Sequence, residues 1–151
     1  MKFSVDIDIL AGRGRLLDVF MDLQQVKNWR SDVSDFKVLA GQAGETGASI
    51  QFDRKLGTQT VALIETLENN ALPNEITYTY SAPQLWYRCK NSFIPVGLHK
   101  TTWIREFEFR TTGIYKAISI IAPGRFRKQA LKEMQDFKNY CQDKVFAELE
   151  L

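Results

Sequence analysis

The chain opens with a strict alternation of apolar and polar side chains over residues 2–10. Phe3, Val5, Ile7 and Ile9 fall on one face, and charged or hydroxyl-bearing residues fall on the other. A period of two is typical of a strand with one buried face. The pattern therefore predicts a half-buried strand at the start of the chain.

Helical spacing follows two glycines at positions 12 and 14. The apolar residues Leu16, Leu17, Phe20 and Leu23 recur every three or four positions, and a second short turn carries Val26 and Trp29. This spacing predicts two short helices. The Gly-Arg-Gly stretch lacks both the third glycine of a dinucleotide fingerprint and the Gly-Lys-Ser/Thr ending of a phosphate loop, so neither site is expected.

Residues 35–110 return to a period of two, broken at glycines and prolines into six short segments. Segments of this length joined by turn signals predict an antiparallel meander. Gly57-Thr58 suits a two-residue hairpin turn. With that turn, Arg54 faces Val61, Phe52 faces Leu63 and Ile50 faces Glu65. Residues 69–74, which include Pro73, are expected to form another turn.

The last third of the chain predicts one long amphipathic helix over residues 125–148. Its apolar stripe consists of Phe126, Ala130, Met134, Phe137, Cys141 and Val145. Pro123-Gly124 either starts this helix or kinks it away from a shorter helix at residues 114–121. Both alternatives stay open at this point.

This order of elements resembles the START/polyketide-cyclase superfamily (SRPBCC), which includes the pollen-allergen type of helix-grip fold. The resemblance covers essentially the whole chain. The matching segments are the early helix pair with Val19-Phe20, Leu23, Val26, Trp29 and Val33, then Gly47-Ala-Ser-Ile50, Leu72-Pro73-Asn74-Glu75-Ile76 with Tyr78-Thr-Tyr80, and the helix region 113–140. The resemblance implies an α+β fold, in which a curved seven-stranded antiparallel sheet wraps around the C-terminal helix. It also implies a cavity for an apolar or amphipathic molecule, but it supplies no catalytic residue.

Composition narrows the class of protein. A chain of 151 residues with 44% hydrophobic residues is expected to form a single START/polyketide-cyclase-like domain over residues 1–151. Two cysteines and one histidine are too few for a disulfide scaffold or a multi-histidine metal site, so no metal and no cofactor are expected. Asp6 and Asp8 interrupt the first apolar residues, and no run is long enough to span a membrane. We therefore expect a cytoplasmic protein.

Charge is unevenly spread between the two halves of the chain. Residues 1–75 carry 8 Lys/Arg and 11 Asp/Glu, whereas residues 76–151 carry 12 and 7. The basic excess over residues 85–132 is either an ordinary solvated surface or a weak attraction to anionic membranes. Basic and aromatic residues also interleave near Trp86 and Trp103, but strands divide them between faces, so no nucleic-acid partner is expected.

The candidate cavity residues are those on the inward strand faces and on the helix stripe. They are Phe52, Arg54, Glu65, Tyr78, Tyr80, Tyr87, Asn91, Phe93, Arg105, Phe107, Met134 and Phe137. A buried arginine must be paired, reach solvent or meet a ligand. Glu65 is the expected partner of Arg54, and Arg105 is the candidate for an anionic ligand group.

The remaining reactive side chains favour structural roles. His99 lies near a turn between strands and is expected to be exposed. Cys89 and Cys141 lie on apolar faces, and Cys89 has no basic partner on its own strand face, so both are expected to be buried apolar residues.

These patterns favour a protein that binds or carries a hydrophobic or amphipathic small molecule of the lipid, polyketide or quinone class. Two alternatives stay open. One is an enzyme of the polyketide cyclase or aromatase kind, in which a tyrosine or arginine polarises a carbonyl group. The other is an accessory protein that associates with membranes or ribosomes through its basic segment. The oligomeric state does not follow from the sequence.

Overall fold

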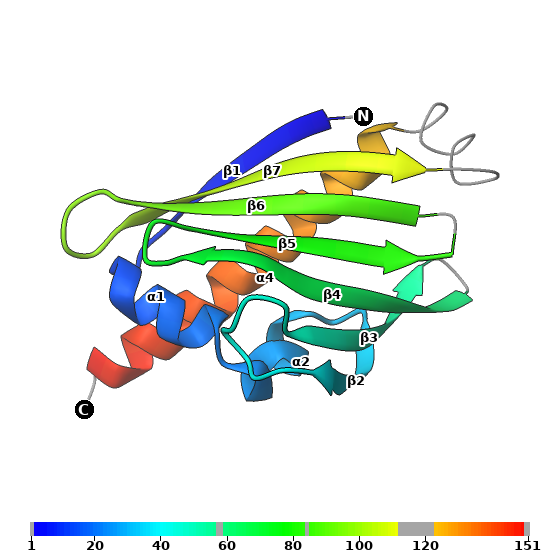
Figure 1. Ribbon diagram of the computed structural model, residues 1–151. Coiled ribbons are helices and arrows are strands. Elements are labelled where there is room, and N and C mark those ends of the chain that lie inside the picture. The colour runs from blue at the N-terminus through cyan, green and yellow to red at the C-terminus, as the bar shows by residue number, and fades with distance from the viewer. Residues whose placement is uncertain (1, 57–58, 84, 112–122, 150–151) are drawn as a thin grey trace.

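Seven antiparallel strands form one curved sheet in the computed structural model, which describes residues 2–56, 59–83, 85–111 and 123–149 (Figure 1). The strands are β1 (Lys2–Ile9), β2 (Val33–Ala40), β3 (Ser49–Leu56), β4 (Gln59–Ala71), β5 (Glu75–Ala82), β6 (Leu85–Pro95) and β7 (Thr101–Thr111). Their order in the sheet is β1-β7-β6-β5-β4-β3-β2. Every neighbour except the β1–β7 pair is consecutive in sequence, so the predicted meander is confirmed.

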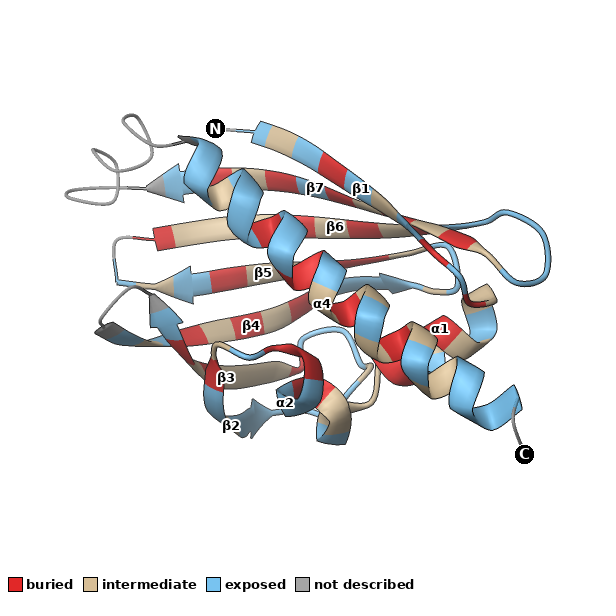
Figure 2. Cartoon of the chain, turned by 180° about the vertical axis from the view of Figure 1, so that it is seen from behind, coloured by how far each residue is buried: buried red, intermediate tan, exposed pale blue. Residues whose placement is uncertain are grey.

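Helices cover one face of this sheet. They are α1 (Arg13–Phe20), the 3-10 turn η1 (Leu23–Gln25), α2 (Val26–Trp29) and the long helix α4 (Pro123–Leu149). Figure 2 shows α4 crossing the sheet diagonally, with its buried residues turned toward the strands. The long helix begins at Pro123, where a missing backbone N–H costs nothing. The shorter helix considered at residues 114–121 lies outside the described residues.

The β3–β4 hairpin has the predicted register. Arg54 faces Val61, Phe52 faces Leu63 and Ile50 faces Glu65, while the turn at residues 57–58 lies outside the described residues. The next turn is shorter than predicted. Residues 69–71 belong to β4, because a bulge between Leu67 and Asn69 keeps the strand paired with β5.

The densest part of the core lies under the C-terminal half of α4. Phe137, Met134 and Cys141 are fully buried there. The ring of Phe20 lies between aromatic rings from three other elements, with centroids at 5.2 Å for Phe93, 5.6 Å for Trp103 and 5.7 Å for Phe137. Edge contacts of this kind add to the burial of apolar area, so this half of the helix is fixed firmly to the sheet.

β2 is an irregular edge strand. Its pairing with β3 shifts between Val33 and Asp35 and again between Val38 and Ala40. The loop that follows contains Gly41, Gly44 and Gly47 at φ values of 71°, 89° and 91°. Residues with a side chain rarely adopt such values, which explains why the strand pattern breaks at these glycines.

Candidate functional site

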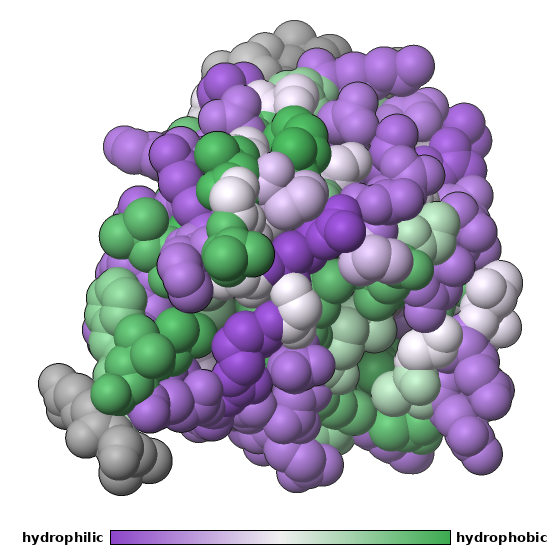
Figure 3. All heavy atoms as spheres, turned by 90° about the vertical axis from the view of Figure 1, so that its left-hand side faces the viewer, coloured by the Kyte–Doolittle hydropathy of each residue, from purple (hydrophilic) through white to green (hydrophobic). Residues whose placement is uncertain are grey.

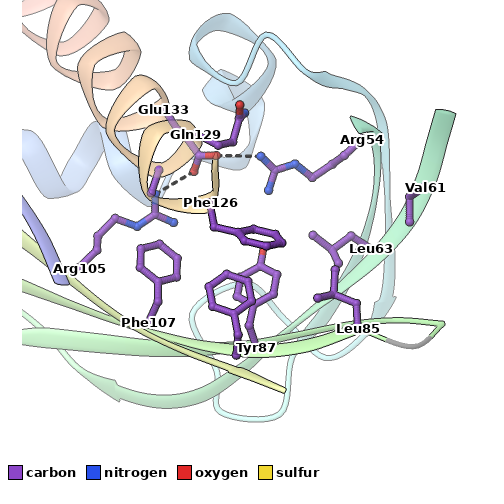
Figure 4. A pocket seen from close by; sticks show the side chains of 12 residues that line it. Arg54, Val61, Leu63, Leu85, Tyr87, Arg105, Phe107, Phe126, Gln129 and Glu133 are labelled. Carbon is purple, nitrogen blue, oxygen red and sulfur yellow. Dashed lines mark hydrogen bonds and ion pairs between the residues drawn. The ribbon is translucent and has the colours of Figure 1, made fainter. Parts of the chain in front are cut away.

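A pocket of about 90 Å³ lies between the N-terminal turns of α4 and the sheet (Figure 4). We call it the α4 pocket. Strands β3, β4, β6 and β7 supply Arg54, Val61, Leu63, Leu85, Tyr87, Arg105, Phe107 and Phe109, and the helix supplies Phe126, Gln129, Ala130 and Glu133. The period of two on each strand turns these side chains to one face, so the sheet builds most of the wall.

Aromatic and aliphatic side chains form the greater part of that wall. Phe109 lies 4.8 Å from Phe126 and 4.8 Å from Tyr87, measured between ring centroids. The Tyr87 hydroxyl makes no hydrogen bond to another described residue. Burial raises the pKa of Tyr87, and the nearby Arg54 opposes that effect only in part. Tyr87 therefore stays protonated and can donate a hydrogen bond to a ligand.

Charged groups close the inner end of the α4 pocket. Glu133 accepts hydrogen bonds from Arg54 Nη2 at 2.8 Å and from Arg105 Nη1 at 3.2 Å, as the dashed lines in Figure 4 show. Arg54 Nε also donates to Asp32 at 2.7 Å. We call these residues, together with Arg30 and Glu65, the ion cluster. Of its six members, only Asp32 is more than 10% exposed at its side chain, at 17%.

Mutual attraction keeps Glu133 and Arg54 ionised despite their burial. Burial alone would raise the pKa of Glu133, but Arg54, Arg105 and Arg30 outweigh it and hold that pKa well below its ordinary value. Burial would likewise lower the pKa of Arg54, yet Glu133 and other neighbouring groups raise it. Opposite charges at this distance favour the charged forms of both groups, so the pocket has permanently charged donors and a permanently charged acceptor at its inner end.

A second pocket, of about 50 Å³, lies on the other side of the ion cluster. We call it the α2 pocket, because α1, η1, α2 and the loop after β2 form one wall and β3, β4 and β5 the other. It is lined by Phe20, Met21, Leu23, Val26, Arg30, Ala43, Gly44, Ala48, Ile50, Phe52, Glu65, Leu67 and Tyr78. Arg30 Nε lies 3.9 Å from Glu133 Oε1. The two pockets thus share one charged partition.

The predicted cavity residues fall into three groups. Arg54, Tyr87, Arg105 and Phe107 line the α4 pocket, and Phe52, Glu65 and Tyr78 line the α2 pocket. The others, Tyr80, Asn91, Phe93, Met134 and Phe137, line neither. Asn91 accepts from Trp103 Nε1 at 3.0 Å and donates to the Ile76 carbonyl, so its amide connects strands instead of facing a pocket.

One predicted pairing is wrong. Glu65 does not pair with Arg54. It accepts a hydrogen bond from Tyr80 Oη at 2.7 Å and lies 3.6 Å from Arg30 Nη1. Cys89 has a basic partner on the neighbouring strand, because Arg105 Nε lies 3.4 Å from its sulfur. Burial nevertheless raises the pKa of Cys89, so it is still a poor nucleophile. His99 is exposed, as predicted.

Sequence reasoning missed three members of the ion cluster, which are Glu133, Arg30 and Asp32. Asp32 lies in the turn between α2 and β2, where no periodicity applies. Glu133 lies three residues after Ala130 and four before Phe137, so a charged side chain at helical spacing within the apolar stripe was the available signal. Arg30 follows Trp29 at the end of a four-residue helix. No periodicity predicts the direction of a side chain in so short an element.

The comparisons with known proteins give the fold. No protein-family model matches the chain, and no curated protein sequence is significantly similar to it. Solved structures do resemble it. The Zhui aromatase/cyclase from Streptomyces sp. R1128 superposes with a TM-score of 0.79 at 9% identity, covering 96% of this chain and 95% of that one. The chain has the helix-grip fold of the START/SRPBCC superfamily.

Two further structures share this START-type fold. A START superfamily protein from Mycobacterium smegmatis gives a TM-score of 0.76 at 11% identity, with 95% of this chain and 98% of that chain covered. A norcoclaurine synthase point mutant from Thalictrum flavum, in complex with a transition state analogue, gives 0.73 at 8% identity and covers 96% of both chains. At this identity the likeness concerns the START-type fold alone.

Two features are absent from the described residues. No helix there combines the length and apolar character needed to cross a bilayer. No three histidine, cysteine, aspartate or glutamate side chains in that part of the chain group as metal ligands would.

Proposed function

We propose that the protein binds a hydrophobic or amphipathic small molecule in the α4 pocket. The observation that carries this proposal is the composition of the pocket, which has apolar walls and one polar inner end. Binding sites for small molecules commonly combine such walls with a few placed polar groups. The similar START-type structures support the same kind of partner.

The pocket also indicates which part of a ligand it would hold. An apolar cavity of roughly 150 Å³ can bind benzene, so a pocket of about 90 Å³ suits one ring or a short chain end. The rest of the molecule would lie at the mouth, beside the exposed Gln129. An oxygen of a lipid, polyketide or quinone would reach the free hydroxyl of Tyr87. Because the ion cluster pairs its charges internally, a neutral oxygen fits this end better than an anion.

The first experiment is native mass spectrometry of freshly purified protein, followed by organic extraction. A defined bound mass identifies the ligand class. Titration with 2-naphthol, a fluorescent pair of fused rings with one hydroxyl, then tests the pocket, which would hold one ring while the other lies at the mouth.

Ala130→Trp fills the α4 pocket and should weaken 2-naphthol binding about tenfold or more, which corresponds to about 1.4 kcal/mol. Ala147→Trp is the matched control, because Ala147 is exposed on the same helix outside the pocket. Equal affinities of the two variants would overturn the proposal.

An enzyme of the cyclase or aromatase kind is the second candidate. Tyr87 in the α4 pocket could polarise a carbonyl group. Acid–base chemistry is less favoured there, since Glu133 is held at a low pKa and Tyr87 at a high one. If Tyr87→Phe abolishes turnover of a poly-carbonyl substrate and leaves binding intact, the enzyme is supported. A protein that binds such substrates without converting them is a carrier.

Weak contact with anionic membranes is a separate proposal about the surface. Apolar side chains interrupt the polar surface at the end of the molecule that carries the β6–β7 turn (Figure 3). Leu98 in that turn is 85% exposed, and Val96 is 48% exposed. Salt-sensitive co-sedimentation with anionic liposomes, reduced by Leu98→Asp, would support the contact. We also propose that the protein is cytoplasmic, which its two free buried thiols support.

A further inference from the structure

Arg30 is a buried cation that lacks close acceptors. It is 7% exposed and lines the α2 pocket. Its guanidinium, including the buried Nε, makes no hydrogen bond to another described residue. The nearest carboxylate oxygens belong to Glu65 at 3.6 Å and Glu133 at 3.9 Å. Those distances are too long for hydrogen bonds, so Arg30 has unused donors beside a pocket.

The other two arginines of the ion cluster differ from Arg30 in this respect. Arg54 donates at 2.7 Å and 2.8 Å, and Arg105 donates to Glu133 at 3.2 Å. Arg30 also lies over aromatic rings, as Arg105 does, with its Cζ 4.7 Å from the ring of Trp29 and 5.2 Å from that of Phe52. Cation–π contacts of this kind hold the position of a guanidinium without using its N–H groups.

Tyr78 brings a second underused donor to the same pocket. Its hydroxyl donates to Met21 Sδ at 3.6 Å, and a thioether is a weak acceptor. Burial raises the pKa of Tyr78, so the hydroxyl keeps its proton. Arg30 and Tyr78 come from α2 and β5, and both would gain from an acceptor oxygen placed between them.

The charges around the pocket decide what kind of acceptor fits. Arg30, Arg54 and Arg105 are matched by three carboxylates, those of Glu65, Glu133 and Asp32. An added anion would leave this buried region with an excess negative charge close to Glu65, which is costly. A neutral acceptor satisfies the donors without that excess. The remaining walls are mainly apolar, including Met21, Phe52 and Leu67.

We propose that the α2 pocket is a second binding site, which takes the carbonyl oxygen of a small neutral ketone, amide or ester between Arg30 and Tyr78. The charged partition separates it from the α4 pocket. The site therefore does not depend on the function proposed for that pocket, and it is tested with different probes and variants.

The experiment is a nitrogen-15 NMR titration of the full chain that follows the Arg30 Nε–H and Trp29 Nε1–H signals. Three probes of similar shape are compared. Cyclopentanone, whose carbonyl group would enter the pocket of about 50 Å³ while its ring lies at the mouth, offers a neutral acceptor. Cyclopentanecarboxylate offers an anion, and methylenecyclopentane offers none. We expect saturable shifts at both signals with cyclopentanone. The other two probes should bind at least about tenfold more weakly, which corresponds to about 1.4 kcal/mol of binding free energy.

Two variants test the donors separately. Arg30→Met should weaken cyclopentanone binding about tenfold or more. Because it also removes a charge from the buried cluster, Tyr78→Phe serves as the second variant and should weaken binding about threefold or more. Tyr140→Phe is the matched control. Its hydroxyl interacts with Asn28 and Gln25 outside the pocket, so cyclopentanone should bind it as it binds the unaltered protein.

Several outcomes would overturn the second site. One is the absence of a saturable shift at the Arg30 Nε–H signal. A slowly exchanging water in contact with that group would then show that water alone satisfies the donors. A second is stronger binding of the carboxylate, and a third is unchanged cyclopentanone binding in Tyr78→Phe. In each case 2-naphthol can still bind the α4 pocket, so failure here is distinguishable from failure of the proposed function.

Discussion

The two parts of α4, divided between Glu133 and Met134 and called its halves below, meet the sheet in different ways. The C-terminal half packs Met134, Phe137 and Cys141 into a closed aromatic core with no measurable exposure. The N-terminal half meets the sheet through Phe126, Ala130 and Glu133, where charges and a pocket replace close packing. One helix thus fixes the fold at one end and forms a pocket wall at the other. The change from a charged pocket wall to an apolar core falls within one turn of the helix, where Glu133 directly precedes Met134.

Removing the charge from Glu133 should have the largest effect on the stability of the N-terminal half. Glu133→Gln leaves three buried arginines with Glu65 and Asp32 as their acidic partners, and loss of a buried ion-pair partner costs about 3–5 kcal/mol. Urea unfolding measures the loss. Asp136→Asn, on the outer face of α4, is the control and should change the free energy of unfolding by less than about 0.5 kcal/mol. A cost for Glu133→Gln as small as that of the control would mean that the cluster does not stabilise this half.

Truncating one phenylalanine in each half compares the packing directly. Phe137→Ala removes a fully buried ring and should cost about 3–5 kcal/mol. Phe126→Ala removes a half-buried ring at the pocket wall and should cost about 1 kcal/mol. Urea unfolding of both variants gives the difference. Equal costs would contradict the view that the N-terminal half is loosely packed, and Phe126→Ala should also change 2-naphthol affinity.

Acid should weaken the N-terminal half first. Glu133 has a lowered pKa in the folded protein, whereas an unfolded glutamate has a pKa of about 4.3. The stabilisation is therefore complete above about pH 5 and is lost as the pH falls, because the unfolded state then binds one more proton. The free energy of unfolding then falls by at most about 1.4 kcal/mol per pH unit through this group. Unfolding measured from pH 7 to 3 should show a shallower slope for Glu133→Gln than for the unaltered protein, and parallel curves would exclude Glu133 as the group responsible.

The smallest effect is expected on the outer face of the same helix turn. Lys132 and Asp136 form an i,i+4 ion pair with 2.9 Å between Nζ and Oδ2. Exposed pairs of this kind contribute about 0.3–0.5 kcal/mol. Lys132→Gln should lower stability by that amount at low salt and leave it unchanged in 1 M NaCl. A larger effect that survives salt would show that Lys132 interacts with the buried cluster.

The alternation of side chains was sufficient to predict the sheet, the β3–β4 register and the inward direction of Arg54, Glu65 and Arg105. It could not predict which charges pair. Arg54 reaches Glu133 on α4 and Asp32 before β2, and both contacts depend on how distant elements dock. Arg30 is set by a short helix whose direction only the packed structure fixes. The division into two pockets likewise follows from side-chain contacts between elements, which no local pattern records.

The irregular edge strand β2 has a consequence for self-association. An open edge with exposed apolar residues, here Val38 and Leu39, is a template on which a second chain can add a strand. The two register shifts interrupt the regular row of backbone groups, and the charged residues Asp35 and Lys37 are exposed along the same strand. Bulges and charges at an edge disfavour intermolecular strand addition. The same irregularity thus disfavours the addition of a second chain along β2.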